Sequence, residues 1–164
     1  ENQDKPDFHY ETTAREYYEQ LGGRIDAIVI GCGTGGTFTG IARYLKERNP
    51  KILAIAVETE GSVLGGGEKG DHEVEGIGAS FIPKTFDRSL ADEIIAVTDR
   101  DAFDMVKKLA GMEGVLAGSN AGANVFAAIG IAKKLGPGKK VATIIPDSAE
   151  RYLSKGIFQF NDKK

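Results

Sequence analysis

The sequence has little of several residue types that particular protein classes require. It contains one cysteine, two histidines and no tryptophan among its 164 residues. A single cysteine excludes an internal disulfide framework, and together with only two histidines it argues against a structural zinc site. No apolar run approaches the roughly 20 residues of a membrane-spanning helix. We therefore expect a globular protein of the reducing cytoplasm, with no membrane segment and no bound metal.

An excess of charge of one sign is also lacking. The 21 Lys and Arg residues oppose 24 Asp and Glu residues, which gives a net charge of -3, and no basic stretch occurs. Nucleic acids and anionic lipid surfaces are bound mainly through clustered positive charge, so we expect neither as a partner. The chain also lacks the signatures of a P-loop, of a G-x-S-x-G nucleophile elbow and of an H-E-x-x-H zinc site.

Glycine is present in excess, at 22 of 164 residues, nearly twice the ordinary share of roughly 7%. In a chain without repeats, this excess indicates loops that are shaped around a ligand or packed closely on their neighbours. The chain opens without Met, in what resembles a connecting segment, and its polar start has no signal-peptide pattern. We expect a fragment, a processed product or one piece of a longer chain.

Length and patterning predict that residues 1–164 form a single α/β domain of three layers, with helices on both faces of a mostly parallel sheet. Expected strands cover residues 27–30, 52–57, 94–97, 115–117 and 141–145. Expected helices cover residues 12–20 and 36–48, a segment after Thr98, a segment that ends near residue 135, and a final segment after Pro146. The glycine-rich segment 61–78 is too long for a neutral connection and predicts a functional loop.

The sharpest motif is the turn Gly31–Gly40, with the sequence G-C-G-T-G-G-T-F-T-G, between a buried strand and an amphipathic helix. Consecutive backbone N–H groups at a helix start, in a loop almost free of Cβ atoms, form a concave positive site for a phosphate. The hydroxyls of Thr34 and Thr37 can add donors. No Lys or Arg lies in the turn, so the backbone would carry the binding. The alternative is a tight turn that serves only helix–strand packing.

A dinucleotide-binding interpretation also fits this turn. Gly31, Gly33 and Gly36 satisfy G-x-G-x-x-G, and Glu58 lies 22 positions after Gly36, where dinucleotide folds place the acid that binds the ribose. Against it, the pattern is short and threonines stand where apolar helix residues usually pack. The alternative function is therefore an NAD(P)-binding Rossmann domain of an oxidoreductase.

The other motifs of the chain favour a different phosphate. In order, they are H-Y-E-T-T at 9–13, G-T-G-G-T at 33–37, H-E-V-E-G-I-G at 72–78, E-G-V-L-A-G at 113–118 and P-D-S-A-E-R-Y-L-S at 146–154. This series resembles the carboxyl-terminal half of the cysteine synthase and cystathionine β-synthase family, which are pyridoxal-phosphate enzymes of fold type II. The resemblance covers nearly the whole chain.

The resemblance implies that pyridoxal 5′-phosphate is the cofactor and that its phosphate is held by Gly33, Thr34, Gly35, Gly36 and Thr37. It also implies that Gly76 and Gly78 border the amino-acid substrate, with turn geometry alone as the alternative. The family's serine partner of the pyridine nitrogen aligns with Asn120, one residue after Ser119. Either residue could contact the ring, Asn120 as a neutral amide donor, or simply cap a helix. We expect Asp147 or Ser148 to cap the final helix, with contact to the cofactor ring as the alternative.

A larger departure from the family is an absence. The family's Schiff-base lysine and its substrate-carboxylate loop belong to the amino-terminal half, and neither motif occurs here. The resemblance implies β-replacement on serine or O-acetylserine with a thiol, as in cysteine synthase or cystathionine β-synthase, for sulfur amino-acid biosynthesis. The acceptor, sulfide or homocysteine, stays open. We expect the isolated chain to be inactive, with no catalytic residue of its own. Its implied partners are the missing amino-terminal half and a second copy in a homodimer.

Overall fold

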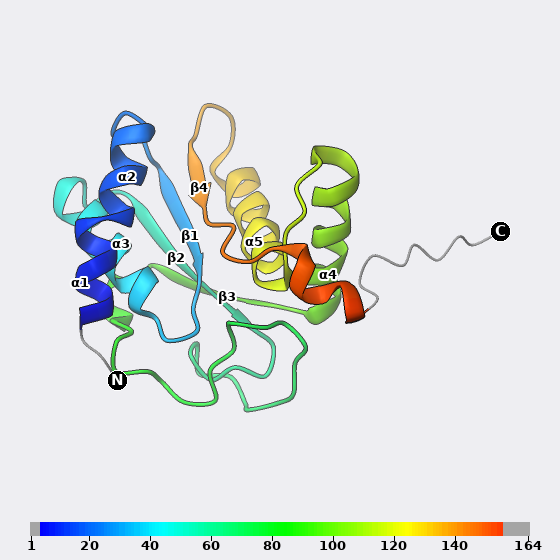
Figure 1. Ribbon diagram of the computed structural model, residues 1–164. Helices are drawn as coiled ribbons and strands as arrows, with labels where there is room; N and C mark the ends of the chain where they lie inside the picture. Colours follow the sequence, from blue (N-terminus) through cyan, green and yellow to red (C-terminus); the bar gives the residue numbers. More distant parts are fainter. Residues whose placement is uncertain (1–3, 156–164) are drawn as a thin grey trace.

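The computed structural model describes residues 4–155, which form a parallel sheet between two layers of helices (Figure 1). The sheet has the strand order β3-β2-β1-β4, and every pairing is parallel. Its strands are β1 (Ala27–Gly31), β2 (Leu53–Thr59), β3 (Glu93–Val97) and β4 (Val141–Thr143). The parallel register places the carboxyl ends of β1 and β2 at one edge, since Gly31 pairs with Val57. The predicted α/β fold is confirmed.

Helices cover both faces of the sheet, as the apolar strand sequences require. One layer holds α1 (Asp4–Glu11), α2 (Thr13–Gln20) and α3 (Gly36–Arg48), and the other holds α4 (Asp99–Lys108) and α5 (Ser119–Leu135). Successive side chains of a strand point to opposite faces. Ile28 and Ile30 accordingly pack in the core under α2 and α3, while Val29 packs in the core under α4 and α5. No described helix is both long and apolar enough to cross a membrane.

The expected strand over residues 115–117 is wrong. Only an isolated antiparallel bridge forms there, between Ala117 and Ser148. Because no described strand pairs with this segment beyond that bridge, Val115 and Leu116 stay exposed. The segment follows a π-helical turn, Leu109–Glu113, that the sequence pattern did not predict.

Both ends of the described chain also differ from expectation. Helix α1 was not predicted, although its proline, Pro6, lies in the first turn, where a missing N–H costs no helical hydrogen bond. Strand β4 is shorter than the expected strand and ends at Thr143. The expected final helix is a 3-10 helix, η3 (Ala149–Lys155).

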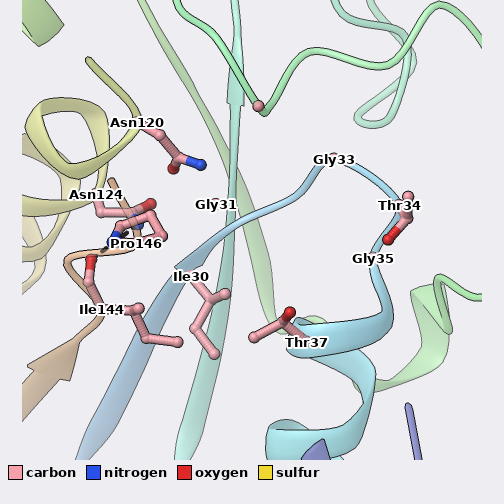
Figure 2. A pocket seen from close by; sticks show the side chains of 11 residues that line it. Ile30, Gly31, Gly33, Thr34, Gly35, Thr37, Asn120, Asn124, Ile144 and Pro146 are labelled. Carbon is pink, nitrogen blue, oxygen red and sulfur yellow. Dashed lines mark hydrogen bonds between the residues drawn. The ribbon is translucent and has the colours of Figure 1, made fainter. Parts of the chain in front are cut away.

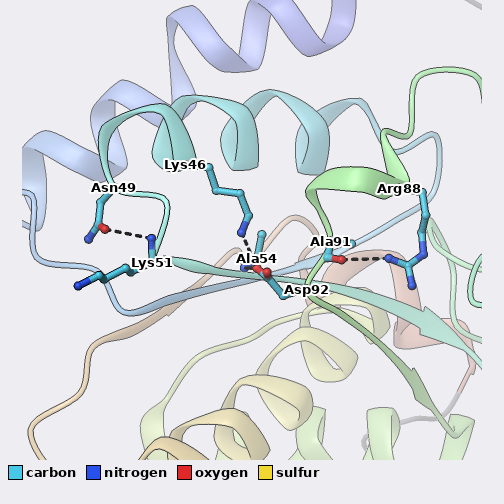
Figure 3. Close-up of polar contacts among 7 residues, drawn as sticks. All are labelled: Lys46, Asn49, Lys51, Ala54, Arg88, Ala91 and Asp92. Atoms are coloured by element: carbon cyan, nitrogen blue, oxygen red, sulfur yellow. Dashed lines mark hydrogen bonds and ion pairs between the residues drawn. The ribbon is translucent and has the colours of Figure 1, made fainter.

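The last turn of α3 is fixed to the amino ends of β2 and β3 by Asp92 (Figure 3). Asp92 Oδ2 accepts a hydrogen bond from the backbone N–H of Ala54 at 2.7 Å and pairs with Lys46 Nζ at 2.6 Å. Because α3 runs antiparallel to the strands, its first turn then lies at the opposite edge of the sheet, beside the carboxyl end of β1 (Figure 1).

Candidate functional site

A cavity of about 210 Å³ lies at the carboxyl end of β1 (Figure 2). Four segments that are far apart in the sequence meet in it. Its lining residues are Ile30, Gly31, Gly33, Thr34, Gly35, Thr37, Gly76, Asn120, Asn124, Ile144 and Pro146. The cavity therefore combines the β1–α3 turn, the glycine-rich loop, the start of α5 and the segment after β4. Six of the predicted site residues line it: Gly33, Thr34, Gly35, Thr37, Gly76 and Asn120.

The β1–α3 turn needs glycine because other parts of the site approach its backbone. A Cβ on Gly31 would lie 2.5 Å from Asn120 Oδ1 and 2.7 Å from Asn124 Oδ1, and a Cβ on Gly33 would collide with the Gly76 carbonyl oxygen. Gly35, the N-cap of α3, has φ 81°, a left-handed conformation that side chains with a Cβ rarely adopt. The turn, which we call the cradle, is thus closely packed against Asn120, Asn124 and Gly76, and it also lines the cavity.

The electrostatics of the cradle come from the backbone. The first turn of a helix leaves its N–H groups without intrahelical acceptors and carries a partial positive charge. No side chain within residues 4–155 caps α3, and no acid lies in its first turn. Among the residues that the structure describes, no Lys or Arg lines the cavity. This start of α3 can therefore bind an anion through amides alone, as the turn sequence predicts. Gly36 is buried at that start but does not line the cavity.

Thr37 is held by a histidine that the sequence left without a role. His9 Nε2 lies 3.0 Å from Thr37 Oγ1, and His9 Nδ1 lies 3.0 Å from Thr13 Oγ1. Burial, followed by the charge of Lys5, lowers the pKa of His9 below its ordinary value of 6.5. A neutral imidazole between two hydroxyls fixes the Thr37 side chain at the cavity wall. The H-Y-E-T-T motif contains both partners of the His9–Thr13 contact, but only the fold brings Thr37 to His9.

The start of α5, unlike that of α3, is capped by a carboxylate from elsewhere in the chain. Asp147 accepts hydrogen bonds from the backbone N–H groups of Asn120 and Ala121, at 3.1 and 2.9 Å, and from the Tyr152 hydroxyl at 2.7 Å. The expectation of a structural cap is correct, but Asp147 caps α5 and not the final helix. Burial raises the pKa of Tyr152 to about 12.

The structure distinguishes Ser119 from Asn120. Ser119 is fully buried and its Oγ accepts a hydrogen bond from the Glu75 backbone N–H at 3.0 Å, so it fixes the glycine-rich loop and does not line the cavity. Asn120 does line it, and its side chain projects from α5 toward the end of β1 (Figure 2).

Gly76 and Gly78 have different surroundings. Gly76 lines the cavity, whereas Gly78 lies outside its lining. The His72 ring contacts the loop on both sides of Gly76: Nδ1 lies 3.1 Å from the Val74 carbonyl oxygen and Nε2 lies 3.1 Å from the Gly78 carbonyl oxygen. The two residues that follow His72 are also held, because the backbone N–H groups of Glu73 and Val74 donate hydrogen bonds to the Asp99 carboxylate. The segment that carries Gly76 is therefore firmly held.

Asn124 is a site residue that the sequence analysis missed. It lines the cavity with only 1% of its surface exposed, and its Nδ2 donates to the Ile144 carbonyl oxygen at 3.1 Å. The Oδ1 atoms of Asn124 and Asn120 are both buried without a hydrogen-bond partner among the described residues. The available signal was an amide four residues after Asn120, on the same face of an otherwise apolar helix.

Glu58 does not take the place of a ribose ligand. It is 5% exposed, and both carboxylate oxygens accept a hydrogen bond from the Gly65 N–H, at 3.1 and 3.2 Å. It is not part of the cavity lining. The carboxylate fixes the glycine-rich loop, so the geometry argues against the dinucleotide interpretation.

Comparisons with known proteins agree on one family. The family description "Pyridoxal-phosphate dependent enzyme" matches residues 1–147. A cysteine synthase of Helicobacter pylori is 49% identical over 96% of this chain and 52% of its own, and an O-acetylserine dependent cystathionine beta-synthase of Bacillus subtilis is 47% identical over the same shares.

Solved structures show the same fold. The O-acetylserine dependent cystathionine beta-synthase from Helicobacter pylori superposes with a TM-score of 0.92 at 49% identity, over 96% of this chain and 52% of that one. O-Acetyl Serine Sulfhydrylase isoform 3 from Entamoeba histolytica gives a TM-score of 0.94 at 34% identity, over 99% and 49%. The chain thus spans about half the length of the curated relatives it matches.

Proposed function

This chain belongs to the family of pyridoxal-phosphate dependent enzymes, and from that premise we propose that it supplies the cofactor-phosphate site of an enzyme that replaces the β-substituent of serine or O-acetylserine with a thiol. The observation that carries the proposal is the cavity at the carboxyl end of β1. It combines a helix start without a described side-chain cap, a glycine turn where a Cβ at Gly31 or Gly33 would collide with the facing residues, and an amide side chain, Asn120, in the lining. These residues fit a phosphorylated aromatic ring.

The phosphate would be held by the β1–α3 turn. The backbone N–H groups of Gly33, Thr34, Gly35, Gly36 and Thr37 surround the open start of α3, and the Thr37 hydroxyl, fixed by His9, adds a directed contact. A helix start attracts a dianion through the same N–H groups that have no acceptor in the helix. Because none of the described residues that line the cavity is cationic, backbone N–H groups and the Thr37 hydroxyl would carry the binding.

The ring would lie between the Gly76 segment and the start of α5. We propose that Asn120, rather than Ser119, meets the pyridine nitrogen, since Ser119 Oγ is engaged by the loop. When bound, pyridoxal phosphate supplies an electron sink for the bond changes at the amino acid. Gly76 leaves room for the substrate beside the ring, and Gly78, with φ 87°, shapes the loop that bears it.

The rest of the active site would come from another segment. The cavity of about 210 Å³ is smaller than the roughly 300–1,000 Å³ of ordinary small-molecule sites, and none of the described residues that line it is a lysine. We propose that the amino-terminal half of such an enzyme closes the cavity and supplies the lysine that carries the cofactor and moves protons, and that the complete enzyme is a homodimer. The names of the relatives favour O-acetylserine as the donor.

Binding of pyridoxamine 5′-phosphate tests the cofactor site, because this analogue has no aldehyde to react with surface lysines. We expect saturable binding by isothermal titration calorimetry, competition by inorganic phosphate and no binding of NAD. Binding of NAD without binding of pyridoxamine 5′-phosphate would instead support the oxidoreductase alternative.

Reconstitution tests the reaction. The chain is mixed with the separately produced amino-terminal half of the Helicobacter pylori cysteine synthase, and thiol-dependent product formation from O-acetylserine is measured with pyridoxal phosphate present. We expect turnover only with both pieces. Turnover by this chain alone would refute the division of roles.

A further inference from the structure

Two buried amide oxygens converge on one point of the cavity. Asn120 and Asn124 lie four residues apart on α5 and therefore on the same face of the helix. A Cβ on Gly31 would lie 2.5 Å from one Oδ1 and 2.7 Å from the other. Neither oxygen accepts a hydrogen bond from a described residue. Buried acceptors are rarely left unsatisfied, so this pair needs a donor.

The orientation of Asn124 is fixed. Its Nδ2 donates to the Ile144 carbonyl oxygen at 3.1 Å, and turning the amide over would set Oδ1 against that carbonyl oxygen. Asn124 Oδ1 must therefore face the open side of Gly31, where Asn120 lies (Figure 2). The side chain is only 1% exposed, so the packing around it holds this orientation.

The orientation of Asn120 is not fixed in this way. No described residue accepts a hydrogen bond from its Nδ2, which lies 3.2 Å from the position of a Gly76 Cβ. The oxygen and nitrogen of an amide exchange places by a half-turn with almost no change in shape, so the hydrogen-bond network decides between them. A half-turn brings Nδ2 to the Gly31 side, toward the unpartnered Oδ1 of Asn124, and leaves the Asn120 oxygen facing Gly76 and the cavity.

We propose that Asn124 is a positioning residue that turns the Asn120 amide so that its oxygen, and not its nitrogen, faces the bound ring. This inference rests on the proposed function. An acceptor oxygen selects a donor, so the pyridine nitrogen binds in its protonated form. The resemblance described in the sequence analysis suggested the opposite role for Asn120, that of an amide donor to the ring nitrogen. A water that donates to both oxygens would keep Nδ2 toward the cavity and is the competing arrangement.

The test measures ring protonation directly. Pyridoxamine 5′-phosphate labelled with ¹⁵N in the ring is bound to the chain, and the ¹⁵N chemical shift is followed against pH. We expect binding to raise the proton affinity of the ring nitrogen by about tenfold or more. A bound nitrogen that loses its proton at the same pH as the free compound, or at a lower pH, overturns the inference.

Two variants separate positioning from stability. Asn124→Leu removes the acceptor behind Asn120 and is expected to abolish the rise in proton affinity. Asn120→Asp, which offers only oxygens, is expected to keep it. Ile131→Val, buried on the same helix outside the cavity lining, is the control for a slightly loosened α5 and should leave the titration unchanged. A full rise in the Asn124→Leu variant would assign the effect to Asn120 alone and overturn the role of Asn124.

The outcomes also separate this inference from the proposed function. Failure of the unaltered chain to bind pyridoxamine 5′-phosphate contradicts the cofactor site itself. Binding with a neutral ring nitrogen leaves the cofactor site in place and contradicts only the assignment of Asn120 and Asn124. If Asn124→Leu does not fold, the titration of the unaltered chain still decides the ring's protonation.

Discussion

Two helix starts point toward the same cavity, and the chain treats them in opposite ways. The start of α3 has a glycine N-cap, no side-chain cap and no acid in its first turn. The start of α5 is covered by the Asp147 carboxylate, which takes the N–H groups of Asn120 and Ala121. Both helices carry the same kind of dipole. Of the two helix starts, only that of α3 therefore keeps N–H groups that could bind an anion.

The covered start has a function of its own. With its N–H groups satisfied and a negative charge beside it, α5 does not compete for a phosphate, and its first turn becomes a rigid support for Asn120. In the proposed site, the glycine turn at the start of α3 would set where the phosphate binds, and Asn120 at the start of α5 would contact the rest of the cofactor. Breaking each arrangement should therefore have a different signature.

The largest effect is expected from filling the open cradle. Gly33→Ala places a Cβ against the Gly76 carbonyl oxygen, which forces the turn and the loop apart. We expect the affinity for pyridoxamine 5′-phosphate to fall by about 100-fold or more, measured by calorimetry, because the oriented N–H groups move. Gly130→Ala is the matched control, since a Cβ there meets nothing within 4 Å. It should bind normally, and an equal loss in both variants would contradict the role of the cradle.

Covering the α3 start with a charge should weaken binding without weakening the fold. In Thr37→Asp, a carboxylate occupies the first turn and repels the phosphate. We expect the affinity for pyridoxamine 5′-phosphate to fall by about tenfold or more, while the free energy of unfolding stays the same or rises by about 0.3–1 kcal/mol, because acids stabilise helix starts.

Thr37→Asn is the neutral control for that variant. It keeps a side chain of similar size and a donor near His9, so its affinity should lie between those of the unaltered chain and Thr37→Asp. If the two variants bind equally weakly, the hydroxyl and not the open dipole carries the site.

Removing the charge that caps the start of α5 should weaken the fold and leave phosphate binding nearly unchanged. Asp147→Asn removes the charge from the cap and brings an amide N–H₂ group near the donors of Asn120, Ala121 and Tyr152. We expect a loss of about 1–2 kcal/mol in the free energy of unfolding, measured in urea. Phosphate affinity should change far less than in Thr37→Asp. Ser148→Ala, at an exposed neighbour that contributes only its backbone, should leave stability nearly unchanged.

This contrast between helix starts also marks what the sequence could predict. The open start is local: a buried strand, the five residues G-T-G-G-T at 33–37 and an amphipathic helix follow one another in the sequence. The bounds of α3 and the position of the glycine turn were therefore predictable. The covered start is not local. Asp147 reaches α5 from the segment after β4, and the polar contact of Asn124 is to Ile144. Only the packed sheet brings these residues together, so the cap was assigned to the wrong helix and Asn124 was missed.

The covered start should weaken at alkaline pH. The pKa of Tyr152 is raised to about 12 from 10, so the folded chain holds the phenol protonated over a range in which the unfolded chain releases the proton. Stability is therefore present below pH 10 and decreases as the pH rises toward 12. Urea unfolding at pH 9 to 11 should show a steeper decrease in the unaltered chain than in Tyr152→Phe. Parallel profiles would mean that the pKa of the Tyr152 hydroxyl is the same in the folded and the unfolded chain.

The open start should weaken at acid pH, with the smallest effect of the series. The pKa of His9 is lowered below 6.5 by burial and by Lys5, so the folded chain favours the neutral imidazole that contacts Thr13 and Thr37. The unfolded chain takes up a proton first as the pH falls through 6.5. This contribution to stability is therefore present above pH 6.5 and decreases as the pH falls toward the lowered pKa. In His9→Gln, urea unfolding between pH 7.5 and 5.5 should show a flatter profile than in the unaltered chain. An identical slope in the two proteins would show that the neutral His9 imidazole does not hold Thr37.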